Sequence, residues 1–327
     1  MRGGAKRYRL GAATLAAVWS LCSGPPPALA LAPTRAETST EQSAVTRTFR
    51  ECPACPEMVT IPAGTYAMAA KLATDGRPGG EQWPGERGSI GTDHTVQIRR
   101  FAFGLHDVTR TEYALFVRES HYRPAPGCYI WRLETWIEDK TKSWREPGFR
   151  QSPSDPVVCV NRNDAQAYTA WLNRQSAPAN QGGRDEVGPY RLPTWEEMEY
   201  AAAGRSTTNY YWGDAPDHSH ANYGDRHCVP CTPVREGRDQ WVYTSPVGAF
   251  PPNAFGLYDM AGDVWQWTDT CWPEVKRRVC WLAAAHGGSW LDNPEYLRTA
   301  SFRLLEPSNR NTTTGFRVAR RAPAGNH

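Results

Sequence analysis

The sequence predicts a single α+β domain in which regular secondary structure is sparse. Its 327 residues are 40% hydrophobic, which is enough to bury one full core. The 14 tryptophans, against only 5 methionines, are typical of a rigid aromatic interior rather than of a helical bundle. Three helix starts are readable, and the dense turn residues after the third leave room only for short strands. We therefore expect few helices, short strands and long loops.

The first 30 residues have the parts of a secretory signal peptide. Basic residues precede an apolar run from Leu10 to Leu21, and Ala28-Leu29-Ala30 offers small residues where a signal peptidase cleaves. The run is too short to cross about 30 Å of hydrocarbon, so we expect no membrane span. Residues 31–50 are rich in Thr, Ala, Ser and Glu and predict a disordered tether, which leaves 51–323 as the domain. The protein is expected to be periplasmic or secreted.

Charge and cysteine content narrow the possible partners and compartment. Removing residues 1–30, which hold four cations and no acid, lowers the formal net charge from +3 to −1. That removes the electrostatic case for binding nucleic acid. Eight cysteines remain, an even number that predicts disulfides in an exported chain. The pairs favoured by low loop-closure entropy are Cys52–Cys55, Cys128–Cys159, Cys228–Cys231 and Cys271–Cys280.

The predicted strands come early in the domain. Residues 58–64 indicate a short strand and turn, and residues 71–91, with their glycine-rich runs, indicate a long loop. The stretch from Ile98 to Val108 alternates apolar and polar residues well enough to predict one strand.

Capping residues mark the starts of the three helices. They are Thr109 with Glu112, Asn161, and Thr194 with Glu197. The second helix carries Ala165, Tyr168, Trp171 and Leu172 at helical spacing. Gly204 is a suitable stop for the third.

Several separated motifs carry a resemblance to a known family. The longest are Phe255–Trp267 (FGLYDMAGDVWQW), Gly287–Trp290 (GGSW) and Gly315–Arg320 (GFRVAR). Shorter ones, in chain order, are His106–Thr109, Asp155–Val158, Tyr190–Thr194 and Ser245–Gly248. From about Cys52 to Arg321 the chain resembles the formylglycine-generating enzymes, also called sulfatase-modifying factors. The resemblance implies a C-type-lectin-like formylglycine-generating-enzyme fold.

The resemblance is incomplete at the residues that carry the family's reaction. It implies a copper-binding cysteine two residues after the Gly-Gly-Ser-aromatic turn and another a few residues later. Asp292 stands at the first place, and no cysteine follows Cys280. Soft Cu(I) needs thiolate ligands, whereas a carboxylate offers hard oxygen. We therefore expect that formylglycine generation is lost.

Two classes of function remain for such a member. The resemblance implies that relatives without the cysteine pair oxidise thiol-histidine compounds or a siderophore chromophore. The His-x-x-x-His iron motif of the thiol-histidine branch does not occur in these 327 residues, so that option is disfavoured. The first class is thus a divergent oxidative tailoring enzyme with an unidentified redox metal. The second is a non-catalytic module that binds a peptide or glycan.

The candidate pocket surrounds the Gly-Gly-Ser turn. Its members are Ser289, Trp290, Asp292, Arg317 and His286. Arg317 is expected either to pair with Asp292, to hold an anionic group, or to brace the terminal strand from inside. A Ser-His-Asp triad is disfavoured, because six residues of turn cannot align a relay and no GxSxG elbow is present. We expect a monomer that acts on a peptide or small molecule.

The resemblance also implies two structural calcium sites, since loops without regular hydrogen bonds can be fixed by a hard cation. The first would use the side chains of Asn222 and Asp239 with the backbone oxygens of Tyr223 and Trp241. The second would use the side chains of Asp259 and Gln266 with the backbone oxygens of Met260, Gly262 and Val264. Gln266 stands where the family has Glu, so the second site has lost a charge. The alternative is that these are ordinary polar groups of turns.

A further run combines residue types that zinc or copper prefers. It comprises His218, His220, His227, Cys228 and Cys231. In an oxidising compartment a Cys-x-x-Cys pair is more often a disulfide, which is the interpretation we favour.

Overall fold

A five-stranded antiparallel sheet joins the beginning and the end of the domain. The computed structural model describes residues 48–68, 94–132, 135–176, 190–224, 239–272 and 280–322. The strand order is β1 (Thr48–Phe49), β2 (Met58–Ile61), β5 (Phe101–Gly104), β13 (Ala319–Arg321) and β8 (Tyr190–Arg191). Strand β1 lies inside the stretch 31–50 that the sequence predicts to be a tether, so the fold begins earlier than expected. The signal peptide predicted at residues 1–30 lies outside the described residues.

A four-stranded sheet supports the candidate site. Its order is β11 (Phe302–Leu305), β10 (Leu282–His286), β9 (Trp265–Trp272) and β12 (Thr314–Gly315). Strands β9 and β12 run parallel and the other pairs are antiparallel. The register places His286 opposite Gln266 at one end of β9 and β10, and the Gly-Gly-Ser turn follows directly. A 3-10 helix, Pro294–Leu297, comes next in the chain.

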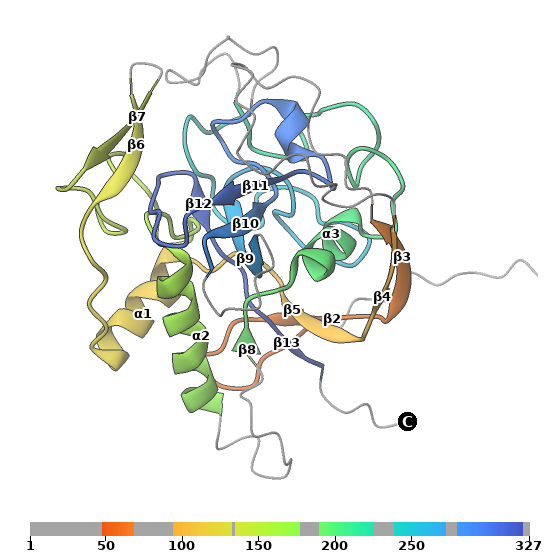
Figure 1. Cartoon of the computed structure of the whole chain (residues 1–327), viewed down its shortest axis with the longest axis horizontal. Helices are drawn as coiled ribbons and strands as arrows, with labels where there is room; N and C mark the ends of the chain where they lie inside the picture. Colours follow the sequence, from red (N-terminus) through yellow and green to blue (C-terminus); the bar gives the residue numbers. More distant parts are fainter. Residues whose placement is uncertain are drawn as a thin grey trace, which may run out of the picture. The chain divides into compact units, whose positions relative to one another are not determined.

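The helix starts predicted from capping residues are confirmed. Helix α1 (Arg110–Ser120) and helix α3 (Trp195–Ala203) each begin with a complete capping box, at Thr109 and Thr194. Helix α2 (Arg162–Ser176) begins after Asn161, whose side-chain oxygen accepts from the Asp164 amide at 2.8 Å. Gly204 ends α3 with a left-handed φ of 55°. Helices α1 and α2 lie side by side (Figure 1).

Two hairpins complete the fold, and one of them corrects a prediction. Strand β3 (Gly64–Met68) pairs with β4 (His94–Ile98), and β6 (Cys128–Arg132) pairs with β7 (Thr135–Asp139). The strand predicted from Ile98 to Val108 is too long, because Ile98 ends β4 and only Phe101–Gly104 of the predicted range forms β5. The exposed Arg99 and Arg100 separate β4 from the fully buried β5, because two adjacent cations cannot continue a buried strand. The long loop at 71–91 lies outside the described residues.

Aromatic side chains fill the main core, as the tryptophan content predicts. Tyr113 and Phe116 of α1 pack on Tyr168 and Trp171 of α2, and Phe316 of the GFRVAR motif contacts both Tyr113 and Tyr168. These rings are almost completely buried. The described residues all belong to one compact unit, residues 45–327. The fold is therefore α+β with a large aromatic core and short strands.

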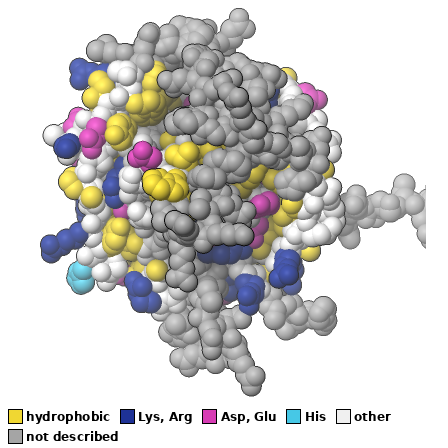
Figure 2. All heavy atoms as spheres, in the orientation of Figure 1, with side chains coloured by type: hydrophobic (Ala, Val, Ile, Leu, Met, Phe, Trp, Pro, Cys, Tyr) yellow, Lys and Arg dark blue, Asp and Glu magenta, His cyan; other side chains and the backbone are white. Residues whose placement is uncertain are grey.

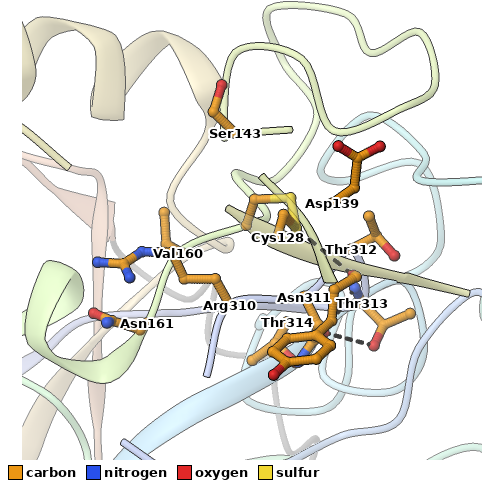
Figure 3. The surroundings of a disulfide bond; sticks show 12 residues. Cys128, Asp139, Ser143, Val160, Asn161, Arg310, Asn311, Thr312, Thr313 and Thr314 are labelled. Carbon is orange, nitrogen blue, oxygen red and sulfur yellow. Dashed lines mark hydrogen bonds between the residues drawn. A yellow bond between two sulfur atoms is a disulfide. The ribbon is translucent and has the colours of Figure 1, made fainter. Parts of the chain in front are cut away.

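Three of the four predicted disulfides form in the described part of the chain: Cys52–Cys55, Cys128–Cys159 and Cys271–Cys280. Cys228–Cys231 lies outside it. The Cys128–Cys159 bridge links the base of the β6–β7 hairpin to the segment before α2. The Cys159 amide also donates to the Asn311 carbonyl at 3.0 Å, beside the threonines 312–314 (Figure 3). This bridge therefore fastens three segments that are distant in sequence.

The surface mixes charge types. On the face shown in Figure 2, Lys and Arg side chains are interspersed with Asp, Glu and hydrophobic ones. Across the described helices, none is long and apolar enough to span a bilayer.

Candidate functional site

The Gly-Gly-Ser turn needs both of its glycines. Gly287 and Gly288 adopt φ values of 106° and 76°, in the region that favours glycine. A Cβ on Gly288 would lie 2.7 Å from Leu297 Cδ1 and 2.9 Å from the Tyr296 carbonyl oxygen. The turn therefore packs tightly on the following 3-10 helix. This packing fixes where Ser289, Trp290 and Asp292 lie.

Asp292 is held by one of its two carboxylate oxygens. Its Oδ2 accepts from Trp265 Nε1 at 2.6 Å and from the Ser289 hydroxyl. Its backbone carbonyl accepts from the Gly224 amide at 3.0 Å, and the residue is partly exposed. Burial raises the pKa of Asp292, while the nearby Arg303 cation and the hydrogen bonds from Ser289 and Trp265 oppose that rise. The Asp292 carboxylate is thus held by hydrogen bonds from Trp265 and Ser289, and it offers an oxygen at this position.

Arg303 also belongs to this site, although it is not among the site residues predicted from the sequence. Its guanidinium carbon lies 4.8 Å from the Trp265 ring centroid. The guanidinium donates to Thr314 Oγ1 at 2.5 Å and Thr313 Oγ1 at 3.2 Å, and burial lowers its pKa to about 10. The one available signal was an arginine inside the otherwise apolar strand β11, FRLL.

Trp290 is buried beside two more exposed rings. Its Nε1 donates to the Thr312 carbonyl at 3.1 Å, which ties the turn to the segment before β12. Tyr243 and Phe149 stack on each other with centroids 4.4 Å apart, and both meet Trp290 edge-on. Both rings are half-buried and Leu291 packs against the group. The turn therefore has a partly exposed aromatic cluster around Trp290.

Arg317 does not pair with Asp292. Its side chain has 0% exposure, and it donates to the backbone carbonyls of Gly104 and Leu105 at 2.9 Å each and of Tyr258 at 2.6 Å. Its Nε lies 3.7 Å from the buried carboxylate of Asp107. Of the three roles considered for Arg317, the structure supports the internal brace.

His286 and Ser289 do not form a catalytic relay. His286 Nε2 hydrogen-bonds the Thr299 carbonyl at 2.7 Å, so this nitrogen carries the proton. The Ser289 hydroxyl instead donates directly to Asp292. Burial lowers the pKa of His286 to about 4, which keeps the ring neutral. Ser289, Trp290 and Asp292 are thus brought together, whereas His286 and Arg317 point into other contacts.

The first expected calcium set contains an oxygen that lacks a protein donor. Asn222 Nδ2 donates to the Tyr243 carbonyl at 2.7 Å and to Asp263 Oδ1 at 3.0 Å. The buried Asn222 Oδ1 has no partner among the described residues. Asp239 is also buried, accepts from the Trp241 amide at 2.8 Å, and faces His218 Nδ1 at 3.3 Å. Asp239 lines a cleft of about 470 Å³ together with His218, Trp241 and Phe250, whereas Asn222 is not part of its lining.

The second expected set is partly occupied by Arg317. Gln266 Oε1 accepts from Arg317 Nε at 3.1 Å, and Gln266 Nε2 donates to the Asp259 carbonyl at 2.8 Å. Asp259 Oδ1 is buried and has no partner in the described part of the chain. The Met260 and Val264 carbonyl oxygens converge on Gly287, where a Cβ would meet them at 3.4 and 3.9 Å. A cation here would have to take Gln266 Oε1 from Arg317.

The histidine-cysteine run is only partly described. His218 lies next to Asp239, and His220 Nδ1 lies 3.3 Å from Asp217 Oδ2. His227, Cys228 and Cys231 lie outside the described residues. Within the described ranges, no group of three or more His, Cys, Asp or Glu side chains is arranged to hold a metal ion.

Comparison with known proteins identifies the family. Residues 43–322 match the Sulfatase-modifying factor enzyme 1-like domain. The chain belongs to this family. It is 30% identical to the formylglycine-generating enzyme of Mycobacterium tuberculosis, over 80% of this chain and 96% of that protein. It is 28% identical to the inactive Cα-formylglycine-generating enzyme 2 of Bos taurus, over 80% of this chain and 87% of that protein.

A solved structure agrees with this assignment. The chain superposes on PvdO from Pseudomonas aeruginosa with a TM-score of 0.63 and 29% identity, covering 85% of this chain and 98% of PvdO. The fold is thus the C-type-lectin-like fold of the formylglycine-generating-enzyme family.

Proposed function

We propose that this protein is an exported member of the formylglycine-generating-enzyme family that does not generate formylglycine. The observation that carries the proposal is the position of Asp292, whose carboxylate binds Trp265 and Ser289 at the place where the family resemblance implies a copper ligand. A carboxylate is a poor ligand for Cu(I) and cannot exchange with a substrate thiol. The Ser289 hydroxyl also donates its hydrogen bond to Asp292.

The cysteines of the described chain are not placed to substitute. All six are joined in disulfides. Cys271 pairs in register with Ala283, whereas the Gly-Gly-Ser turn follows the Gln266–His286 end of the same strands. Five residues of strand separate Gln266 from Cys271, which corresponds to roughly 17 Å. Among the described residues, the disulfide-bonded cysteines therefore supply no free thiolate to the turn, and Cys228 and Cys231 lie outside the described residues.

Two activities are compatible with such a member. Oxidative tailoring of another substrate is the first candidate, because the resemblance implies such reactions for relatives without the cysteine pair. A non-catalytic module that binds a peptide or glycan is the second, and the 28% identity to an inactive formylglycine-generating enzyme 2 supports it. Metal analysis of the purified protein separates them, since a stoichiometric redox metal favours the enzyme.

Structural calcium is part of the proposal. The first set fits a hard cation, because Asn222 Oδ1 is buried without a protein donor and Asp239 lies in the same region. Bound calcium would supply positive charge to these oxygens and fix the loop around Tyr223 and Trp241. The second set fits less well, because Arg317 already donates to Gln266 Oε1 and to the Tyr258 carbonyl.

Export is supported by the three disulfides. Disulfides persist in oxidising compartments such as the periplasm or the extracellular space and are rare in the cytosol. The three disulfides and the signal-peptide pattern of residues 1–30 therefore both support the proposal that the protein is exported.

Cu(I) competition tests the proposal at its chemical basis. Purified, fully oxidised protein is titrated against a chromogenic Cu(I) chelator, with the Mycobacterium tuberculosis formylglycine-generating enzyme as a positive control. We expect the control enzyme to remove Cu(I) from the chelator, which lowers the absorbance of the chelator complex. We expect this protein to leave that absorbance unchanged. Retention of one equivalent of Cu(I) would contradict the proposal.

A further inference from the structure

We propose that the Cys52–Cys55 disulfide is redox-active and exchanges with the thiols of a peptide or protein dithiol. The pair forms a Cys-x-x-Cys motif in the loop that connects β1 to β2. Cysteines at this spacing can carry out two-electron thiol–disulfide exchange when one of them is accessible and the loop is held in shape. This activity is separate from the chemistry of the Gly-Gly-Ser turn.

The two cysteines of the pair differ in access. Cys52 is partly exposed, whereas Cys55 has 0% exposure and belongs to the main core. An incoming thiolate can therefore reach Cys52 but not Cys55, which fixes the sulfur that is attacked. The other described disulfides lack this difference, because Cys128–Cys159 is buried at both ends and Cys271–Cys280 is partly exposed at both.

Contacts that do not involve sulfur hold this loop in shape. Strands β1 and β2 pair on either side of it, with Phe49 opposite Met58. Inside the loop, the Cys55 amide donates to the Cys52 carbonyl at 3.0 Å. The Arg50 guanidinium donates to the Cys55 carbonyl at 2.8 Å. Because none of these bonds needs the disulfide, the two thiols stay close after reduction and the disulfide can form again.

The acidic residue beside Cys52 is paired. Glu51 forms an ion pair with Arg320 of β13 and accepts from the Tyr190 hydroxyl of β8 at 3.3 Å. An unpaired carboxylate beside a thiol would oppose formation of the thiolate, because like charges repel each other. The pairing of Glu51 reduces that opposition and also fastens the loop to two strands of the five-stranded sheet.

Reduction of this disulfide should leave the protein folded. A disulfide stabilises a fold mainly by constraining the unfolded chain, and the effect grows with the length of the closed loop. The sequence separation is only 3 for Cys52–Cys55, against 31 for Cys128–Cys159. Both oxidation states of the short pair are therefore compatible with the native fold, which reversible exchange requires.

The exchange moves two electrons from the substrate to the protein. A substrate thiolate attacks Cys52, the bond between the two cysteines breaks, and Cys55 leaves as a thiolate that takes up a proton. The second substrate thiolate then attacks the substrate sulfur of this mixed disulfide and releases Cys52 as a thiolate. The substrate leaves as a disulfide and the protein as a dithiol. A small disulfide such as oxidised glutathione restores the protein and is itself reduced to two thiols.

Two single variants test the difference in access. Cys55→Ser leaves Cys52 as the one thiol of this pair, and Cys52→Ser leaves Cys55. With oxidised glutathione under native conditions, we expect Cys52 to form the mixed disulfide at least about tenfold faster than Cys55. Peptide mass spectrometry identifies the modified cysteine. A far-ultraviolet spectrum like that of the wild type and a cooperative melting transition show that both variants are folded.

Turnover tests the activity itself. Purified protein is incubated with a peptide dithiol and excess oxidised glutathione, and oxidation of the peptide is followed by mass spectrometry. We expect a rate about tenfold above the uncatalysed one. The double variant Cys52→Ser/Cys55→Ser should show only the uncatalysed rate. The matched control is Cys271→Ser/Cys280→Ser, which also removes a partly exposed disulfide and should keep the wild-type rate.

Three results would overturn the inference: equal reactivity of Cys52 and Cys55, no peptide oxidation above the uncatalysed rate, or full activity in Cys52→Ser/Cys55→Ser. The last result would assign the activity to other cysteines of the chain. Formylglycine generation is measured separately, with copper and a peptide that holds a single cysteine. Either proposal can therefore fail without the other.

Discussion

Arg317 Nε donates to Gln266 Oε1 across 3.1 Å in the interior of the domain. This contact connects the GFRVAR motif to the FGLYDMAGDVWQW motif. The same guanidinium reaches the backbone carbonyls of Gly104 and Tyr258, so it joins strand β5 to both motifs. The buried side chain of Arg317 thus joins segments that are far apart in the sequence, since Gly104 and Arg317 are separated by 213 positions.

Replacing Arg317 with Ala should destabilise the protein strongly. The change leaves the backbone carbonyls of Gly104, Leu105 and Tyr258 buried without their donor, and each such loss costs about 1–3 kcal/mol. Urea unfolding measures the loss. Arg118→Ala, at an exposed position of α1, is the control and should change stability by less than about 0.5 kcal/mol. Equal unfolding midpoints for the two variants would contradict the brace.

Removing the Cys128–Cys159 bridge should cost more than removing Cys52–Cys55. The first closes a loop with a sequence separation of 31 and the second a separation of 3. The double serine variant of the longer bridge should lose about 2–4 kcal/mol. Urea unfolding of both double variants under non-reducing conditions gives the comparison. A larger loss from the short bridge would be inconsistent with this ordering.

All eight cysteines that follow residue 30 are expected to be oxidised, including Cys228 and Cys231. Thiol titration of the unfolded, unreduced protein measures this. Two or more free thiols would show that the prediction is wrong.

Calcium should raise the melting temperature. A ligand that binds only the folded state at about 100 times its dissociation constant stabilises that state by about 2.7 kcal/mol. Differential scanning fluorimetry with calcium and then with a chelator measures the effect. Asp239→Ala should abolish most of the shift, whereas Asp217→Ala, at an exposed carboxylate of a nearby loop, should leave it intact. An unchanged melting temperature in the wild type would refute the proposed site.

His286 should make the protein less stable in acid. Its folded-state pKa of about 4 lies below the ordinary value of 6.5, so the unfolded chain binds more protons between these values. Stability from this residue is therefore present above pH 6.5 and is lost as the pH falls toward 4, by up to roughly 3 kcal/mol.

The variant His286→Gln isolates this contribution. Its amide can still donate to the Thr299 carbonyl, and it does not titrate. His106, whose pKa burial also lowers to about 4, is present in both proteins, so the difference in unfolding free energy isolates His286. As the pH is lowered, the unfolding free energy of the variant should increase relative to that of the wild type. A difference independent of pH would argue against a buried neutral imidazole.

The sequence predicted features that depend on near neighbours. The capping boxes at Thr109 and Thr194 were readable because their partners lie three residues away. The position of Asp292 after the Gly-Gly-Ser turn was readable for the same reason. The partners of Arg317 and the approach of Arg303 to Trp265 were not, because they depend on how distant segments meet in three dimensions. The strand break at Arg99 and Arg100 was missed because alternation alone does not separate two successive strands.

The most direct test of the central claim is incubation of the purified protein with copper, oxygen and a cysteine-bearing sulfatase peptide. Aldehyde is detected by mass spectrometry and by capture with a hydrazide, and the Mycobacterium tuberculosis formylglycine-generating enzyme serves as the positive control. The account predicts aldehyde with the control and unmodified cysteine with this protein, because Asp292 offers no thiolate for Cu(I). Conversion of the cysteine to formylglycine by this protein would contradict it.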